Sequence, residues 1–136
     1  MSRKVRVEGE PMRYFIVVMM VILCCSGMAV AGQEEYSDPA KPLKFTIGQE
    51  FTIMLKSNRT TGYQWQLAET LNEGIVKLIS TDYKRPEGNL IGAGGKEIWI
   101  FKAVGKGNTT ITMGYVRPWE KETTPAQIIV FRVVVN

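Results

Sequence analysis

The chain has 136 residues, of which 45% are hydrophobic and 22% are charged, and its formal net charge at neutral pH is +4. It contains no histidine and only two cysteines, which removes the usual general base, the usual catalytic triads and the commonest transition-metal ligand. No phosphate-binding, dinucleotide-binding or nucleophile-elbow motif is present either. We therefore expect no catalytic residues, no metal site and no cofactor, and a binding function is favoured by elimination.

The first 31 residues have the pattern of a secretory signal peptide. Basic residues come first, at Arg3, Lys4, Arg6 and Arg13, and residues 14–23 form an uninterrupted apolar run. Small residues follow and end in Ala29-Val30-Ala31, which is an A-x-A cleavage pattern. We therefore expect cleavage after Ala31, an exported protein (periplasmic or secreted), and no stable membrane insertion after cleavage.

Three alternatives to this interpretation of the leader remain open. Met12 is a second plausible start, because Met12-Arg13 followed by the apolar run is a compact signal by itself. A retained anchor is less favoured, because the apolar run is short of the about 20 residues that span a bilayer. Lipid attachment at Cys24 is disfavoured, because Leu23, rather than a small residue, precedes it.

Residues 32–136 form one predicted domain of 105 residues (136 − 31) after a short tether. Four of the 17 basic and two of the 13 acidic residues lie in the leader, so the mature net charge is +2 (13 − 11). This balance predicts no nucleic-acid partner. Both cysteines also lie in the leader, so the exported domain has no disulfide. Separately, we expect it to be a monomer.

Short alternating strands follow one another along the mature chain. Residues 32–42 are polar with two prolines and predict an N-terminal tether, and residues 43–136 predict the folded domain. Alternation of apolar and polar residues predicts strands at 44–47, 50–56, 63–68, 96–103 and 109–115. A further strand is predicted at 75–81, and a nearly continuous apolar run predicts the last strand at 127–135. About seven strands in about 100 residues indicate an all-β fold, an immunoglobulin-like antiparallel β-sandwich.

Three connections between these strands have unusual compositions. The first, at residues 58–62, combines an amide, two threonines and a glycine. The second, at 82–95, is long and ends in Gly92-Ala93-Gly94-Gly95, and the third contains Arg117-Pro118-Trp119. Because antiparallel strands send alternate connections to opposite ends, all three should lie at one end of the sandwich. Taken singly, the first loop also fits a plain turn, the second fits a flexible loop, and the third fits a tryptophan that folds back onto the core.

The three loops together resemble the signature of the chagasin family, proteinaceous inhibitors of papain-like cysteine peptidases. The family pattern is N-P-T-T-G-[YF]-x-W, then G-x-G-G, then R-P-W, on an immunoglobulin-like sandwich. The resemblance covers essentially all of the mature domain. One position departs from it, because Arg59 stands where the family usually has proline; this removes a stiff φ and adds a charge.

The resemblance implies a reversible, non-covalent inhibitor that plugs the active-site cleft of a papain-like cysteine peptidase. Thr60, Thr61 and Gly62 would lie over the catalytic cysteine and histidine, with the glycine loop on one flank and Arg117 and Trp119 on the other. The expected peptidase-binding residues are Asn58, Thr60, Thr61, Gly62, Tyr63, Gly92, Gly94, Gly95, Arg117, Pro118 and Trp119. Tyr63 and Trp65 are expected to support the first loop from within. An exported adhesion or binding module with a non-peptidase partner, or a structural envelope domain, would use the same sandwich differently.

Overall fold

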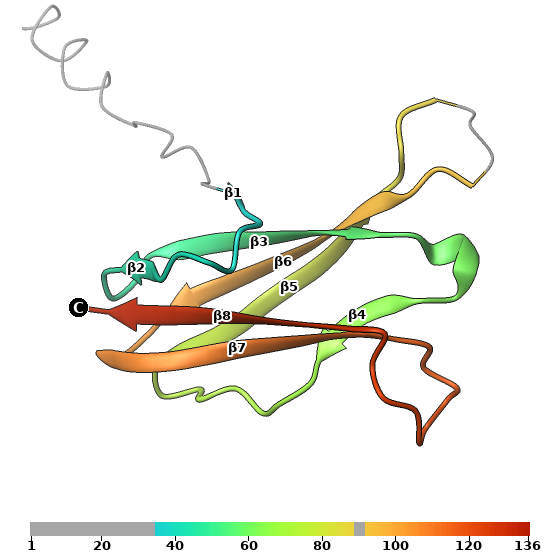
Figure 1. Cartoon of the computed structure of the whole chain (residues 1–136). Helices are drawn as coiled ribbons and strands as arrows, with labels where there is room; N and C mark the ends of the chain where they lie inside the picture. The colour runs from blue at the N-terminus through green and yellow to red at the C-terminus, as the bar shows by residue number, and fades with distance from the viewer. Residues whose placement is uncertain (1–34, 89–91) are drawn as a thin grey trace, which may run out of the picture. The chain divides into compact units, whose positions relative to one another are not determined.

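The computed structural model describes residues 35–88 and 92–136, and the chain divides into two units, residues 1–32 and 33–136. The expected signal peptide lies outside the described residues. The second unit is a β-sandwich of two four-stranded sheets (Figure 1). One sheet has the order β1-β3-β6-β5 and the other the order β2-β8-β7-β4. The strands are β1 (Glu35–Tyr36), β2 (Leu43–Phe45), β3 (Glu50–Ser57), β4 (Gln64–Leu67), β5 (Val76–Lys84), β6 (Gly95–Ala103), β7 (Gly107–Val116) and β8 (Gln127–Val135).

The predicted all-β sandwich is confirmed, and each of the seven predicted strands is present. The largest shifts are at three ends: β5 runs three residues further than expected, to Lys84, β2 ends two residues earlier, at Phe45, and β7 begins two residues earlier, at Gly107. β2 ends early because residues 46–49 already form a turn, in which the Gln49 amide donates to the Thr46 carbonyl at 3.1 Å. Ile47, expected in the strand, is therefore exposed.

Two pairings differ from a wholly antiparallel sandwich. β1 pairs in parallel with β3, and β2 pairs in parallel with β8 at the edge of the other sheet. β1 also lies within residues 32–42, where we expected only a tether. A two-residue strand is too short to show alternation in the sequence, and its pairing depends on β3, about 17 residues further along the chain.

The core lies between the two sheets and is built from the inward faces of the long strands. Alternate residues are buried because successive side chains of a strand point to opposite faces. Phe45 of β2, Phe51 of β3 and Phe101 of β6 stack in sequence, with ring centroids 4.0 and 5.6 Å apart. Ile111, Met113, Phe131 and Val133 of β7 and β8 complete the core from the second sheet. No disulfide contributes, so this apolar packing holds the sandwich.

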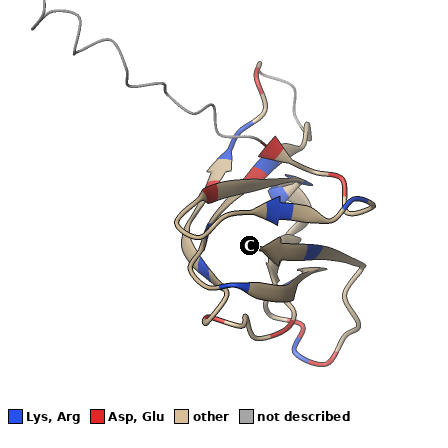
Figure 2. Ribbon diagram, turned by 90° about the vertical axis from the view of Figure 1, so that its left-hand side faces the viewer, with Lys and Arg blue, Asp and Glu red and all other residues tan. Residues whose placement is uncertain are grey.

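The three unusual loops leave the sandwich at one end, and the short turns before β3 and before β7 lie at the other, with the C-terminus (Figure 1). Seen from the C-terminal end, lysine and arginine are interspersed with aspartate and glutamate (Figure 2). Within residues 35–88 and 92–136, no helix has the length and apolar character needed to cross a membrane.

Candidate functional site

Loop 1, residues 58–63 between β3 and β4, is a single 3-10 turn with a cap at each end. The turn spans Arg59–Thr61, and Asn58 caps its start, since its Oδ1 accepts from the Thr60 amide at 3.2 Å. Gly62 closes the turn in the left-handed region, with φ 80°, and its amide donates to the Arg59 carbonyl at 3.0 Å. Hydrogen bonds therefore close both ends of the turn, which holds the loop in one protruding conformation.

The two threonine hydroxyls of loop 1 use their hydrogens within the loop. Thr60 Oγ1 donates to Asn58 Oδ1 at 2.5 Å, and Thr61 Oγ1 donates to the Asn58 carbonyl at 2.7 Å. Both side chains are exposed, so each hydroxyl oxygen still has lone pairs that face solvent. Toward another molecule these hydroxyls are acceptors.

Loop 3, residues 117–126 between β7 and β8, is joined to loop 1 through Arg117. Its Nε donates to the Thr61 carbonyl at 3.3 Å, and its guanidinium carbon lies 4.5 Å from the centroid of the Tyr63 ring. A second guanidinium nitrogen pairs with Glu120 at 3.2 Å, which holds the side chain in this position. Tyr63 in turn stacks on Tyr115 of β7, with centroids 5.2 Å apart.

Trp119 lies at the tip of loop 3 and is 65% exposed. The alternative that it folds onto the core is wrong. Its ring edge instead lies against the backbone of Gly62, where an added Cβ would overlap Cη2 of the indole. Gly62 is therefore fitted for two reasons, its positive φ and the closeness of this ring. Pro118 beside it is also exposed.

Loop 2, residues 85–94 between β5 and β6, is described except for residues 89–91. Its Gly92 carbonyl accepts from Asn58 Nδ2 at 3.2 Å, which joins loop 2 to loop 1. A Cβ added at Gly94 would meet nothing closer than the Ser57 carbonyl oxygen, at 3.5 Å. Space at Gly94 is therefore not needed by the fold.

Gly95, expected in this loop, is the first residue of β6 and is buried. A Cβ there would overlap the Lys84 carbonyl oxygen and the Tyr83 hydroxyl of the neighbouring strand. The packing of β5 on β6 therefore explains this glycine by itself.

Arg59, which replaces the usual proline, stacks on a neighbouring strand. Its guanidinium carbon lies 4.1 Å from the centroid of the Tyr83 ring in β5. This contact links the start of loop 1 to the strand that leads into loop 2. The stiffness that proline would give through its ring is thus supplied here by a contact between side chains.

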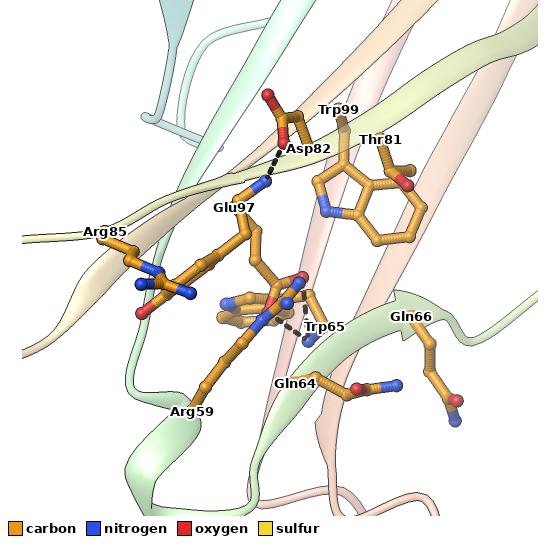
Figure 3. Close-up of a pocket in the computed structure, with 10 residues that line it drawn as sticks. Arg59, Gln64, Trp65, Gln66, Thr81, Asp82, Arg85, Glu97 and Trp99 are labelled. Carbon is orange, nitrogen blue, oxygen red and sulfur yellow. Dashed lines mark hydrogen bonds between the residues drawn. The ribbon is translucent and has the colours of Figure 1, made fainter.

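Glu97 of β6 is not among the site residues expected from the sequence, yet it bonds to residues on both sides of loop 1. This carboxylate is only 4% exposed. It accepts from the Trp65 amide at 3.2 Å (Figure 3) and from Ser57 Oγ at 2.6 Å. Ser57 precedes loop 1 and Trp65 follows it. Trp65 Nε1 also donates to the Lys56 carbonyl at 2.9 Å. The carboxylate therefore clamps the two strands that present the loop.

Tyr115 of β7 was missed as well. Its hydroxyl oxygen accepts from the Asn58 amide at 2.8 Å, and its ring packs between Tyr63 and Trp65. Neither Glu97 nor Tyr115 has a local signal in the sequence, because each acts on residues at least 30 positions away. Within the described ranges, no group of three or more histidine, cysteine, aspartate or glutamate residues is arranged to hold a metal.

Comparison with known proteins agrees with this arrangement. The family model described as "Chagasin family peptidase inhibitor I42" matches residues 44–135. Chagasin of Trypanosoma cruzi is 32% identical over 81 residues, which are 57% of this chain and 73% of that protein. Amoebiasin-2 of Entamoeba histolytica is 29% identical over 123 residues, 88% of this chain and 97% of that protein.

The fold is also found among solved structures. The crystal structure of the cysteine protease inhibitor EhICP2 from Entamoeba histolytica matches with a TM-score of 0.64 at 24% identity, over 76% of this chain and 95% of that chain. This likeness shows the shared fold, and the family match covers the part of the chain that carries the three loops. The protein thus belongs to the chagasin family of peptidase inhibitors, and it is an inhibitor of papain-like cysteine peptidases rather than an enzyme.

Proposed function

We propose that this inhibitor blocks the peptidase cleft reversibly, without a covalent bond, by inserting loops 1, 2 and 3 together. The observation that carries this proposal is the set of contacts that join the loops into one rigid end: Arg117 to the Thr61 carbonyl, Asn58 to the Gly92 carbonyl, and Trp119 on Gly62. Loops that are already ordered lose little conformational entropy on binding, so more of the contact energy appears as affinity.

Loop 1 is the part proposed to cover the catalytic cysteine and histidine. Thr60 and Thr61 are exposed at its tip, and their hydroxyl oxygens still have lone pairs for another molecule. These oxygens accept hydrogen bonds, so they suit donors such as an imidazolium or backbone amides in the cleft. The carbonyls of Asn58 and Arg59 accept hydrogen bonds within the turn, and that of Thr61 accepts from Arg117, so the loop 1 backbone is held in one conformation.

The flanking loops are proposed to make the remaining contacts. Gly92 and Gly94 would bring backbone close to one wall of the cleft, and Pro118 and Trp119 would pack on the other. Arg117 has a double role, since it braces loop 1 and leaves part of its guanidinium at the surface.

Some of the expected contact residues are better explained as internal supports. The Asn58 side chain accepts from the Thr60 amide within the turn and donates to the Gly92 carbonyl of loop 2. Tyr63 lies between Tyr115 and Arg117, and Gly95 is buried in β6. We propose that these three position the loops, and that changes at them act through loop geometry.

Titration of papain with the purified domain tests the proposal. Stoichiometric inhibition that reverses on dilution is expected, with the inhibitor recovered uncleaved and at its original mass. Papain that carries an S-methyl group on its catalytic cysteine should still bind in calorimetry, with some steric loss, because no bond to the sulfur is needed. A covalent adduct, or complete loss of binding on methylation with the cleft otherwise intact, would refute the plug mechanism.

We also propose that residues 1–31 are a signal peptide and that the inhibitor acts after export, as a protein that begins with the short segment 32–42 and continues with the inhibitor domain at 43–136. The basic, apolar and small-residue order of the leader supports this proposal. Mass spectrometry of the native protein should give a chain that begins at Gly32. A native chain that retains residues 14–23 would contradict the proposed cleavage.

A further inference from the structure

A row of three lysines crosses one sheet next to loops 1 and 2. Lys56 of β3 lies opposite Lys96 of β6, and Lys96 lies opposite Lys84 of β5. All three side chains are exposed. Residues directly opposite in a sheet share a face, so the three ammonium groups lie side by side on the outer surface. We call this set the lysine row.

Two carboxylates lie near the lysine row without pairing with it: Asp82, two residues before Lys84 on the same face of β5, and Glu87 of loop 2, which lines a pocket with Lys84 and Lys96. Among the described residues, none of the three ammonium groups is within 4.0 Å of a carboxylate, and the ion pair found there joins Arg117 to Glu120. Glu97, beside Lys96 in the sequence, is buried on the opposite face. Like charges directly opposite one another destabilise a sheet, so the isolated domain carries an unfavourable arrangement at this place.

The same three strands carry a second charged row at their other ends, and its composition is different. Lys77 of β5 lies opposite Lys102 of β6, and Lys102 lies opposite Glu50 of β3. That row has a net charge of +1, whereas the lysine row has +3. The two rows cross β6 at Lys96 and Lys102, six positions apart, which is about 20 Å along a strand. The excess positive charge is therefore local to the end that carries the loops.

The position of the lysine row relates it to the peptidase. The next pair toward the loops is Ser57 opposite Gly95, after which loop 1 begins on one strand and loop 2 ends on the other. A peptidase that receives these loops brings its cleft rim close to the row. Arg85 of loop 2 is exposed, lines a pocket together with Lys84 and Lys96, and adds to the positive potential there. Arg59 is not part of this surface, because it stacks on Tyr83, which is on the opposite face of the sheet.

We propose that the lysine row is an accessory docking surface that favours peptidases with an acidic rim on the side of the cleft that receives loop 2. The inference rests on the proposed function and adds to it the charge of the preferred target. An acidic rim would relieve the repulsion among the three lysines and would attract the inhibitor before contact. Such steering raises the association rate chiefly, and it weakens as salt increases.

The test compares association rates with papain and with papain whose lysine amines have been succinylated, which makes its surface acidic. Active-site titration sets the concentration of each peptidase. Rates are measured at about 10 mM salt, where charges act over about 30 Å, and at about 150 mM, where they act over about 8 Å. The double variant Lys84→Gln/Lys96→Gln removes two of the three lysines of the row, and Lys77→Gln/Lys102→Gln is the matched control, with the same change in charge on the same strands.

The inference predicts that, at low salt, the Lys84→Gln/Lys96→Gln variant associates about fivefold more slowly with succinylated papain than the parent does. The matched control should lose less than about twofold, and the difference should shrink at high salt. Equal losses in the two variants would mean that net charge alone matters, and this would overturn the inference. Binding of the same lysines to anionic phospholipid vesicles, without any difference between the peptidases, would overturn it as well.

The outcome for the proposed function is read separately. If the parent inhibits papain but the two double variants behave alike, the inference about the lysine row fails and the plug mechanism stands. If the parent inhibits neither peptidase, the proposed function itself fails.

Discussion

Truncation of Trp119 is the sharpest single test of the site, because the fold and the proposed interface should respond differently. The side chain is 65% exposed in the free protein and contacts the backbone of Gly62 rather than the core. A tryptophan side chain offers up to about 250 Å². About 160 Å² is therefore still exposed to solvent and can be buried by a peptidase.

The magnitude follows from this area. At about 25 cal/mol per Å², complete burial would contribute about 4 kcal/mol, and part of this is offset by the ordering of the loop and of the peptidase surface. We expect Trp119→Ala to weaken binding by about 2–4 kcal/mol, which is about 30-fold to about 1,000-fold in the inhibition constant. Most of the change should appear as faster dissociation.

The assay is inhibition of papain together with dissociation rates measured by displacement, and chemical denaturation is the control. The free energy of unfolding should change by less than about 0.5 kcal/mol, as for other surface substitutions. A variant that inhibits within twofold of the parent would refute Trp119 as an interface anchor. A variant that loses stability in proportion to its loss of inhibition would show that the indole acts through the fold.

Three further predictions follow from the loops and their supports. Arg59→Ala should raise the inhibition constant about twofold to fivefold, because a stacked guanidinium at an exposed site contributes about 0.5–1 kcal/mol; in a double-mutant cycle, Tyr83→Leu should then add little, and full additivity would exclude the brace. Gly94→Val should weaken inhibition at least about tenfold at a nearly constant melting temperature, since the nearest atom to a Cβ there is 3.5 Å away. The matched Gly95→Ala should lower the melting temperature. Equal inhibition by Gly94→Val would mean that loop 2 only connects two strands. Glu97→Leu should lower the free energy of unfolding by about 3 kcal/mol, because two buried donors lose their acceptor, and unchanged urea denaturation would rule out the clamp.

The strands of the sandwich were predictable because each carries its own pattern. Alternation in β3, β6 and β7 marks which residues point inward, β8 is a nearly continuous apolar run, and short glycine turns precede β3 and β7, so the signal is local. β1 was not predictable, because two residues contain no period. The parallel pairings of β1 with β3 and of β2 with β8 were missed for a related reason. A pairing partner is selected by tertiary packing, and these N-terminal segments add to the open edges of the two sheets.

The sequence alone also determined the placement of the three loops at one end, since antiparallel connectivity assigns each connection to an end before any contact is known. It did not determine what holds the loops together. The carbonyl of Thr61 and the guanidinium of Arg117 are 56 positions apart, and the stacking of Arg59 on Tyr83 joins loop 1 to β5 across 24 positions of chain (83 − 59).

Only the tertiary structure decided the roles of Glu97 and of the lysine row. Nothing in the neighbouring sequence distinguishes a buried glutamate that joins two strands from an exposed one. Glu97 accepts a hydrogen bond from the Trp65 amide of β4, and this contact exists only in the folded sandwich. Likewise, Lys56, Lys84 and Lys96 are scattered in the sequence and become neighbours only through the register of β3, β6 and β5. A shift by one residue in either pairing would send a strand's side chains to the opposite face, so properties that depend on register are fixed by the packing of the whole sandwich.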